Sequence, residues 1–203
     1  MDESISRNSA RLCGRICAAP TFSHQSRGES FYGFPLEVER LSGTTDTVNI
    51  IARKKLIDSL EIGECEKLCV VGELRSFNNK SGEGAKLVIT VFAKELYFCD
   101  GEDENEVHLI GTLCKTPSLR MTPMGRDICD LMLAVNRRYG RSDYLPCITW
   151  GAKARTSAEW DTGTVIELYG RIQSRDYIKH IDGIPTEKTA FEVSVTEIEA
   201  ITM

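Results

Sequence analysis

The sequence predicts an all-β protein built from two tandem five-stranded Greek-key barrels, each with one short helix. Three observations support this prediction: an internal repeat, strand-like alternation of apolar and polar residues, and a helix-like segment before the fourth strand of each copy. A chain of 203 residues is long enough for two small domains of this kind.

The repeat appears when the chain is shifted by 97 residues, which aligns "RLCGRIC" with "HLIGTLC" and "FPLEVER" with "LMLAVNR". A shift of one more residue aligns "CVVGELRSF" with "ELYGRIQSR". We therefore predict an N-terminal copy over residues 8–99, an acidic linker over 100–106 and a C-terminal copy over 107–203. A linker as acidic as "DGEDENE" is expected to stay solvated and extended.

The elements are clearest in the C-terminal copy. We expect strands over residues 106–117, 127–138, 143–150, 164–177 and 189–201. A turn at Gly125 separates the first two strands, and a helix over residues 151–161 separates the third from the fourth. A hairpin loop around Asp182 and Gly183 separates the last two strands, and "ARKKLIDSLEIG" is the matching helix of the first copy. Five strands with a helix between the third and fourth is the order of an OB-fold, which is used for single-stranded nucleic acids and oligosaccharides.

Charge is unevenly distributed along the chain. The net charge of −5 lies entirely in residues 1–106, and the second half is neutral, so any basic groove must arise from local arrangement. Apolar runs are too short to span a bilayer and the first residues lack an apolar signal core, so a cytoplasmic, nucleoid-associated protein is expected.

Eight cysteines without an export signal favour reduced thiols. Cys13 and Cys17, like Cys65 and Cys69, are four residues apart, and neighbouring strands bring such pairs together, but zinc sites usually place two residues between cysteines in a tight turn. We therefore expect core thiols and no metal. No Walker loop, paired-carboxylate nuclease signature or Ser-His-Asp spacing is found, so neither a cofactor nor enzymatic activity is expected.

One predicted strand has an unusual polar face. In "VIELYGRIQSRDY" the period of two places apolar residues on one side, and on the other Glu167, Tyr169, Arg171, Gln173, Arg175 and Tyr177. A solvated face needs charge but has no need for interleaved tyrosines. Aromatic rings among guanidinium groups are suited to stacking on bases and neutralising phosphates.

The second half of the chain resembles the bacterial single-stranded DNA-binding proteins. The motifs are "LIGTLCKTPSLRMTPMGRDICDLMLAVNR", "SDYLPCITWGAKA" and "YGRIQSRDYIKHIDGIPTEKTAFEVSVTEIE", in order and at family-like spacing. The first half resembles the family only through its likeness to the second. The resemblance implies sequence-independent binding of single-stranded DNA in replication, recombination or repair, and a homodimer with four OB-folds.

The resemblance also implies stacking residues, namely Tyr144, Trp150 and Tyr177, with Tyr139 a looser match. Strand parity independently places Tyr144 and Trp150 on one face, about 20 Å apart. Tyr169 is a further stacking candidate, with a subunit contact as the alternative. The candidate phosphate contacts are Arg120, Arg126, Arg137, Arg138, Arg141, Lys153, Arg155, Arg171, Arg175 and Lys179.

Two departures from the family limit what the resemblance implies. The printed sequence stops at "TEIEAITM", without the acidic tail by which housekeeping members recruit other proteins, so recruitment by that route is not expected. In the first copy, Val71, Glu73 and Asn79 replace Tyr169, Arg171 and Tyr177, and Arg53 stands where Trp150 does. We therefore expect the first copy to be mainly an assembly platform. The alternative function is a primosome-type or mobile-element adaptor whose main partner is a protein.

Overall fold

The computed structural model describes residues 7–60, 62, 66–79, 87–137, 140–181 and 184–201. The chain divides into two compact units, each of which contains one barrel. Among the described residues, the N-terminal unit lies within 9–75 and 89–106, and the C-terminal unit lies within 107–201 together with 7–8, 76–79 and 87–88. The boundaries proposed from the sequence stay a prediction.

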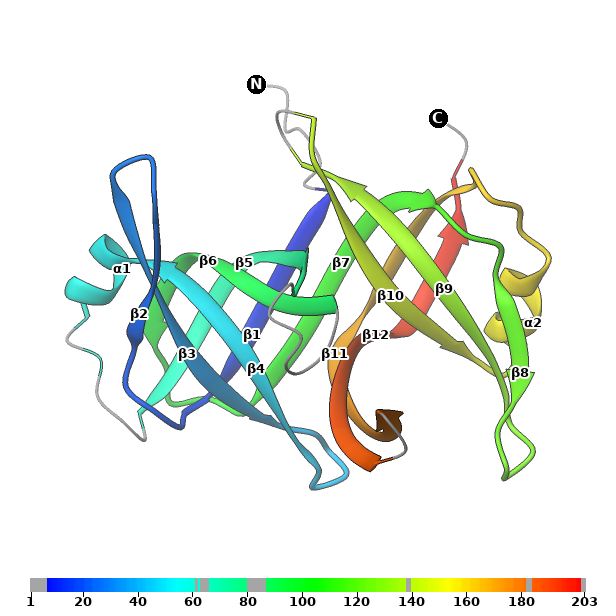
Figure 1. Cartoon of the computed structure of the whole chain (residues 1–203), viewed down its shortest axis with the longest axis horizontal. Helices are drawn as coiled ribbons and strands as arrows, with labels where there is room; N and C mark the ends of the chain where they lie inside the picture. Colours follow the sequence, from blue (N-terminus) through cyan, green and yellow to red (C-terminus); the bar gives the residue numbers. More distant parts are fainter. Residues whose placement is uncertain are drawn as a thin grey trace. The chain divides into compact units, whose positions relative to one another are not determined.

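Both units consist of strands with one short helix (Figure 1). The N-terminal elements are β1 (Asn8–Ile16), β2 (Thr21–Ser26), β3 (Glu29–Glu39), β4 (Thr45–Arg53), α1 (Lys54–Asp58), β5 (Lys67–Asn78) and β6 (Leu87–Phe98). The C-terminal elements are β7 (Glu104–Leu113), β8 (Ser118–Met121), β9 (Asp127–Asn136), β10 (Ser142–Trp150), α2 (Ala152–Ala158), β11 (Val165–Ile181) and β12 (Ile184–Ala200).

The two units share one sheet topology. The strand order is β2-β3-β4-β6-β5-β1 in one and β8-β9-β10-β12-β11-β7 in the other, and β1–β3 and β7–β9 pairings close the two barrels. Each unit has a parallel strand pair at the same place in its strand order, β4 with β6 in the N-terminal unit and β10 with β12 in the C-terminal unit. This arrangement confirms the predicted tandem OB-folds. Neither helix of the described residues is long enough to cross a membrane.

Two details differ from the predicted elements. The short strands β2 and β8 were not predicted, because each is exposed along its whole length and so lacks the apolar alternation of a core strand. Strands β11 and β12 pair as far as Ile181 with Ile184, so they extend beyond the rest of the barrel as a two-stranded ribbon (Figure 1).

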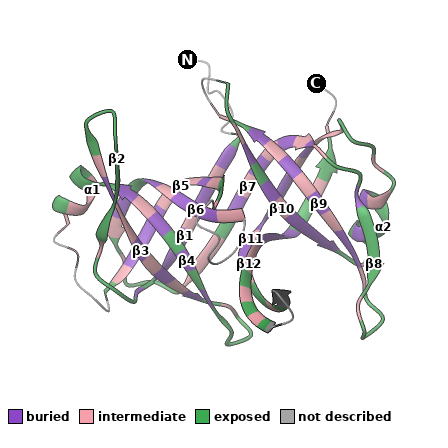
Figure 2. Ribbon diagram, in the orientation of Figure 1, coloured by how far each residue is buried: buried purple, intermediate pink, exposed green. Residues whose placement is uncertain are grey.

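The core follows from residue alternation along the strands. In β10, Leu145 and Cys147 are buried whereas Tyr144 and Trp150 on the other parity are exposed. Figure 2 shows buried and more accessible residues alternating along β9 and β10. Each barrel closes over a glycine, because a Cβ on Gly14 would lie 2.1 Å from the carbonyl oxygen of Glu37, and one on Gly111 would lie 2.6 Å from that of Ala134.

A buried ion pair recurs in both barrels at the repeat distance of 97 residues. Arg40 donates to both carboxylate oxygens of Asp46 at 2.6 Å, and Arg137 makes the same two-pronged contact with Asp143. Both carboxylates are 0% exposed. The backbone N–H of each arginine also donates to a carbonyl across its hairpin. Arg40 donates to the carbonyl of Thr44 at 2.8 Å, and Arg137 donates to that of Arg141 at 2.6 Å.

The expectation that all the cysteines are reduced is wrong for one pair. Cys13 on β1 and Cys69 on β5 lie directly opposite each other, with Cα atoms 4.1 Å apart, and form a disulfide. Their separation of 56 residues corresponds to a stabilisation of about 4 kcal/mol through restriction of the unfolded chain. Cys99, Cys114, Cys129 and Cys147 are free thiols. Cys65 lies outside the described residues.

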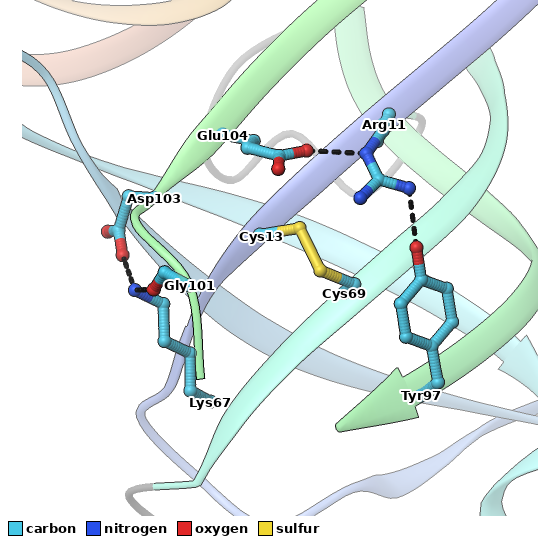
Figure 3. The surroundings of a disulfide bond; sticks show 8 residues. All are labelled: Arg11, Cys13, Lys67, Cys69, Tyr97, Gly101, Asp103 and Glu104. Carbon is cyan, nitrogen blue, oxygen red and sulfur yellow. Dashed lines mark hydrogen bonds and ion pairs between the residues drawn. A yellow bond between two sulfur atoms is a disulfide. The ribbon is translucent and has the colours of Figure 1, made fainter. Parts of the chain in front are cut away.

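Acidic residues of the segment 100–106, for which the sequence predicts a linker, form contacts within the N-terminal unit (Figure 3). The Lys67 ammonium lies 2.7 Å from Asp103, which also accepts a hydrogen bond from the backbone N–H of Glu39 at 2.8 Å. Glu104 forms an ion pair with Arg11. Composition identified a hydrophilic segment, but it could not reveal basic partners distant in the sequence.

Replacing Asp143 by Asn should lower the free energy of unfolding of the C-terminal unit by about 3 kcal/mol, because Arg137 would lose its buried counterion. Urea unfolding followed by circular dichroism would measure the loss. Asp130→Asn is the control, since Asp130 pairs with Arg120 at an exposed position and its replacement should cost less than about 1 kcal/mol. Equal losses in both variants would contradict a structural role for the buried pair.

Candidate functional site

The outward face of the C-terminal sheet gathers most of the residues singled out from the sequence. Arg120 pairs with Ile128 and Ile128 pairs with Trp150, so these three side chains form a row across β8, β9 and β10. A second row joins Ile148 to Ser194 and Ser194 to Arg171, across β10, β12 and β11. The face is therefore assembled from five strands, and its positions are fixed by sheet register.

Trp150 lies at the end of β10 beside a hollow of about 420 Å³. Its side chain is 38% exposed, and its indole Nε1–H donates to Ser194 Oγ at 3.3 Å. The hollow is also lined by Arg126 and Arg155, so an indole and two guanidinium groups border one open space. A flat ring held beside cations is suited to a ligand that combines an aromatic ring with a negative charge.

Two tyrosines extend the aromatic surface. Tyr144 is 52% exposed and points to the same side of β10 as Trp150, in agreement with strand parity. Tyr177 lies on the β11–β12 ribbon, with the Arg175 guanidinium 6.0 Å from the centre of its ring. Two other candidates, Arg138 and Tyr139, and the side chain of Lys179 lie outside the described part of the structure.

Some of the candidate phosphate-binding cations already form ion pairs with carboxylates, and others do not. Arg120 pairs with Asp130, Arg155 with Asp127 at 3.2 Å, and Arg175 with Glu192 at 3.8 Å. All three arginine side chains are 45 to 68% exposed. The carboxylates that pair with Arg120 and Arg155 are also accessible, so these two ion pairs are weak, whereas the Glu192 carboxylate that pairs with Arg175 is buried. Among the described residues, no ion pair involves Arg126, Arg141 or Lys153.

Arg137 and Arg171 differ in how fully their guanidinium groups are hydrogen-bonded. The Arg137 guanidinium is held by buried Asp143 and also donates to the Ser76 carbonyl at 3.3 Å, so its side chain is already engaged within the protein. The Nε of Arg171, by contrast, is buried without a hydrogen-bond partner among the described residues. Buried donors without a hydrogen-bond partner are rare, so the Arg171 Nε is an unusual feature of this face.

An acidic residue that sequence reasoning missed lies within this face. Glu192 is only 6% exposed and accepts a hydrogen bond from Gln173 at 2.8 Å. The alternation in "FEVSV" already places Glu192 and Ser194 on the side opposite Val193 and Val195. A buried carboxylate here lowers the positive potential of the groove and holds Arg175 in place.

Tyr169 lies in different surroundings from the other aromatic residues. Its ring stacks on His108 with centroids 4.5 Å apart, and it lines a hollow of about 210 Å³ with Glu167, Glu197 and Glu199. Burial, followed by the charge of Glu167, raises the pKa of the Tyr169 hydroxyl. Three carboxylates repel phosphate, so these surroundings favour the alternative of a subunit contact over base stacking.

The N-terminal barrel has its own aromatic cluster, which the strand-by-strand comparison missed. Phe31 lies 5.9 Å from Phe92, and the guanidinium groups of Arg53 and Arg75 lie 5.5 and 5.8 Å from the centre of the Phe92 ring. These residues come from four strands, so no single aligned strand reveals them. Glu29 and Glu73 pair with the two arginines, which makes the surface less basic than its arginine content indicates.

Comparison with known proteins locates the same part of the chain. The profile of the Single-strand binding protein family matches residues 104–201. A single-stranded DNA-binding protein of Clostridium tetani is 36% identical over 102 residues, which is 47% of this chain and 68% of that protein. Single-stranded DNA-binding protein B of Bacillus subtilis is 34% identical over 106 residues, 49% of this chain and 87% of that protein.

The similarity has a limited extent in other relatives. In Bacillus subtilis protein A, 33% identity covers 103 residues, or 55% of that protein, so the chain spans about half of some relatives it matches. The fold is similar over nearly the whole chain to the single-stranded DNA-binding protein from Thermus aquaticus, with a TM-score of 0.78, 21% identity and coverage of 97% and 93% of the two chains. On the sequence matches to its second barrel, the chain belongs to the single-strand binding protein family.

Proposed function

We propose that this protein binds single-stranded DNA without sequence preference and protects unwound strands in replication, recombination or repair. The observation that carries the proposal is the outward face of the C-terminal barrel, where Trp150 borders a hollow with Arg126 and Arg155. Membership in the single-strand binding protein family supports the same assignment. Binding of this kind involves no catalytic step.

Base stacking accounts for the lack of sequence preference. Each base has a π-face, so Trp150, Tyr144 and Tyr177 accept any base, and each stacked pair contributes about 1–3 kcal/mol. Phosphates provide the second term, since each cation that displaces a counterion makes binding weaker as salt increases. The exposed pairs of Arg120 and Arg155 exchange a carboxylate for a phosphate, whereas Arg126 and Lys153 gain an anionic partner.

We further propose a homodimer, which would bring four OB-folds together. The exposed ring of Tyr169 supports this proposal, because aromatic residues are enriched at protein interfaces. In this arrangement the N-terminal barrel serves mainly for assembly, and its Phe92 cluster provides at most a subsidiary DNA contact.

Replacing Trp150 and Tyr177 together by Ala should weaken binding to oligo-dT by about 2–6 kcal/mol, because two stacking rings are lost. A fluorescence anisotropy titration would measure the change. Trp150→Phe combined with Tyr177→Phe keeps both rings and should retain most of the affinity. Unchanged affinity in the double Ala variant would rule out this face as the binding surface, and absence of oligo-dT binding by the unaltered protein would favour the adaptor function.

Arg126 and Lys153 should affect the salt dependence of binding more than the fold. Each Ala replacement should reduce the slope of log affinity against log salt by about 0.7 for single-stranded DNA, since one counterion fewer is released. Titrations at four or more salt concentrations would give the slope. Lys55→Ala, on exposed α1 of the other barrel, is the matched control and should leave it unchanged. Equal slopes in all variants would exclude phosphate contacts by Arg126 and Lys153.

Tyr169→Ala should separate assembly from DNA binding. We expect it to lower the solution mass measured by light scattering from that of a dimer toward that of a monomer, while stacking at Trp150 is retained. A loss of oligo-dT affinity with no change of mass would instead assign Tyr169 to the DNA surface.

A further inference from the structure

Three cysteine sulfurs converge in the N-terminal unit, whereas the residues proposed to stack on DNA bases belong to the C-terminal unit. Cys13 and Cys69 form the disulfide between β1 and β5, and Cys99 follows directly after β6. The three Sγ atoms all lie within 4.8 Å of one another. Cys99 is a free, partly buried thiol, so a thiol stands beside a disulfide (Figure 3 shows the disulfide and its neighbours).

Sheet topology explains why these sulfurs meet. Strand β5 lies between β6 and β1, so its Cys69 is flanked by the strands that lead to the other two cysteines. Cys13 is the direct register partner of Cys69. On the other side, the backbone N–H of Cys99 donates to the carbonyl of Lys67 at 3.2 Å, two residues before Cys69. Cys69 is therefore the central sulfur of the group.

We propose that Cys13, Cys69 and Cys99 form a thiol–disulfide exchange site. The Cys99 thiol releases its proton to solvent, and the resulting thiolate attacks Cys69 Sγ. The Cys69–Cys99 bond forms as the Cys13–Cys69 bond breaks, and Cys13 leaves as a thiolate that takes up a proton. One disulfide and one thiol are present before and after the step, so no external oxidant or reductant is required.

The acidic segment beside the site controls which reagents reach it. Asp103 forms an ion pair with Lys67, and Glu104 forms one with Arg11, beside the disulfide (Figure 3). Lys67 and Arg11 neutralise Asp103 and Glu104, so Asp100 leaves one net negative charge, which disfavours anionic disulfides and favours cationic ones such as cystamine. The site is thus suited to internal exchange and to small cationic disulfides, rather than to an anionic disulfide such as oxidised glutathione.

The same surroundings set the direction of the pH dependence. Burial is the main cause that raises the pKa of the Cys99 thiol; Lys67 lowers it, and Asp100, Glu104 and Asp103 raise it. Arg11 and the Tyr97 hydroxyl are the other titratable or charged groups shown at this face. Because the thiolate is the nucleophile, exchange should be slow near neutral pH and accelerate about tenfold per pH unit until Cys99 ionises.

The full-length Cys13→Ser variant provides the first test. After reduction, removal of reductant and oxidation with cystamine, peptide mapping by mass spectrometry should find a Cys69–Cys99 disulfide. Oxidised glutathione should produce the same bond at least several-fold more slowly. Cys13→Ser combined with Cys17→Ser is the control and should give the same yield, since Cys17 is exposed and outside the cluster. Cys13→Ser combined with Cys99→Ser should give only mixed disulfides with cystamine.

A second test uses the unaltered protein and so does not depend on the folding of a variant. Oxidised protein incubated at pH 7 to 10, quenched with acid and alkylated should show a population with Cys13 alkylated and Cys69 linked to Cys99. That population should form faster as the pH rises and be absent from Cys99→Ser. Appearance of the Cys69–Cys99 bond in either experiment would support the proposal, and its absence from both would overturn it.

Discussion

The buried arginine–aspartate pair fixes the strand register on which the candidate surface depends. A carboxylate without access to water requires a counterion, and in each barrel an arginine six residues earlier supplies it across a hairpin. Because Asp143 must face inward, Tyr144 must face outward, and so must Trp150 six residues later on β10. A slip of one residue would bury both rings and expose the carboxylate.

One scaffold thus carries two different surfaces. The closing glycines, the ion pairs and the strand order repeat between the barrels, whereas the outward side chains have diverged. At the end of the third long strand, Trp150 has an open hollow beside it, but Arg53 in the equivalent place covers Phe92 and pairs with Glu29. The repeated features maintain folding, and the diverged ones set what each barrel can contact.

Local pattern was enough to predict the repeat, the main strands and the outward placement of Tyr144 and Trp150, because alternation along a strand directly encodes which side is buried. It was not enough for features that depend on distant residues. The Cys13–Cys69 bond requires knowing that β1 and β5 are neighbours in register, and Lys67 and Arg11 were not recognisable as partners of the acidic segment. Likewise, the sequence around Arg137 is polar and typical of a surface loop, so it did not reveal that the buried carboxylate of Asp143 holds the guanidinium.

The exposed ion pairs of Arg120 and Arg155 have a consequence for the release of a bound strand. If Arg120 and Arg155 contact phosphates as proposed, Asp130 and Asp127 are in place to pair with these two guanidinium groups again when a phosphate departs. Net attraction per contact is correspondingly modest, and a strand can detach one nucleotide at a time. Under the proposed function, a bound strand could therefore be released stepwise rather than all at once.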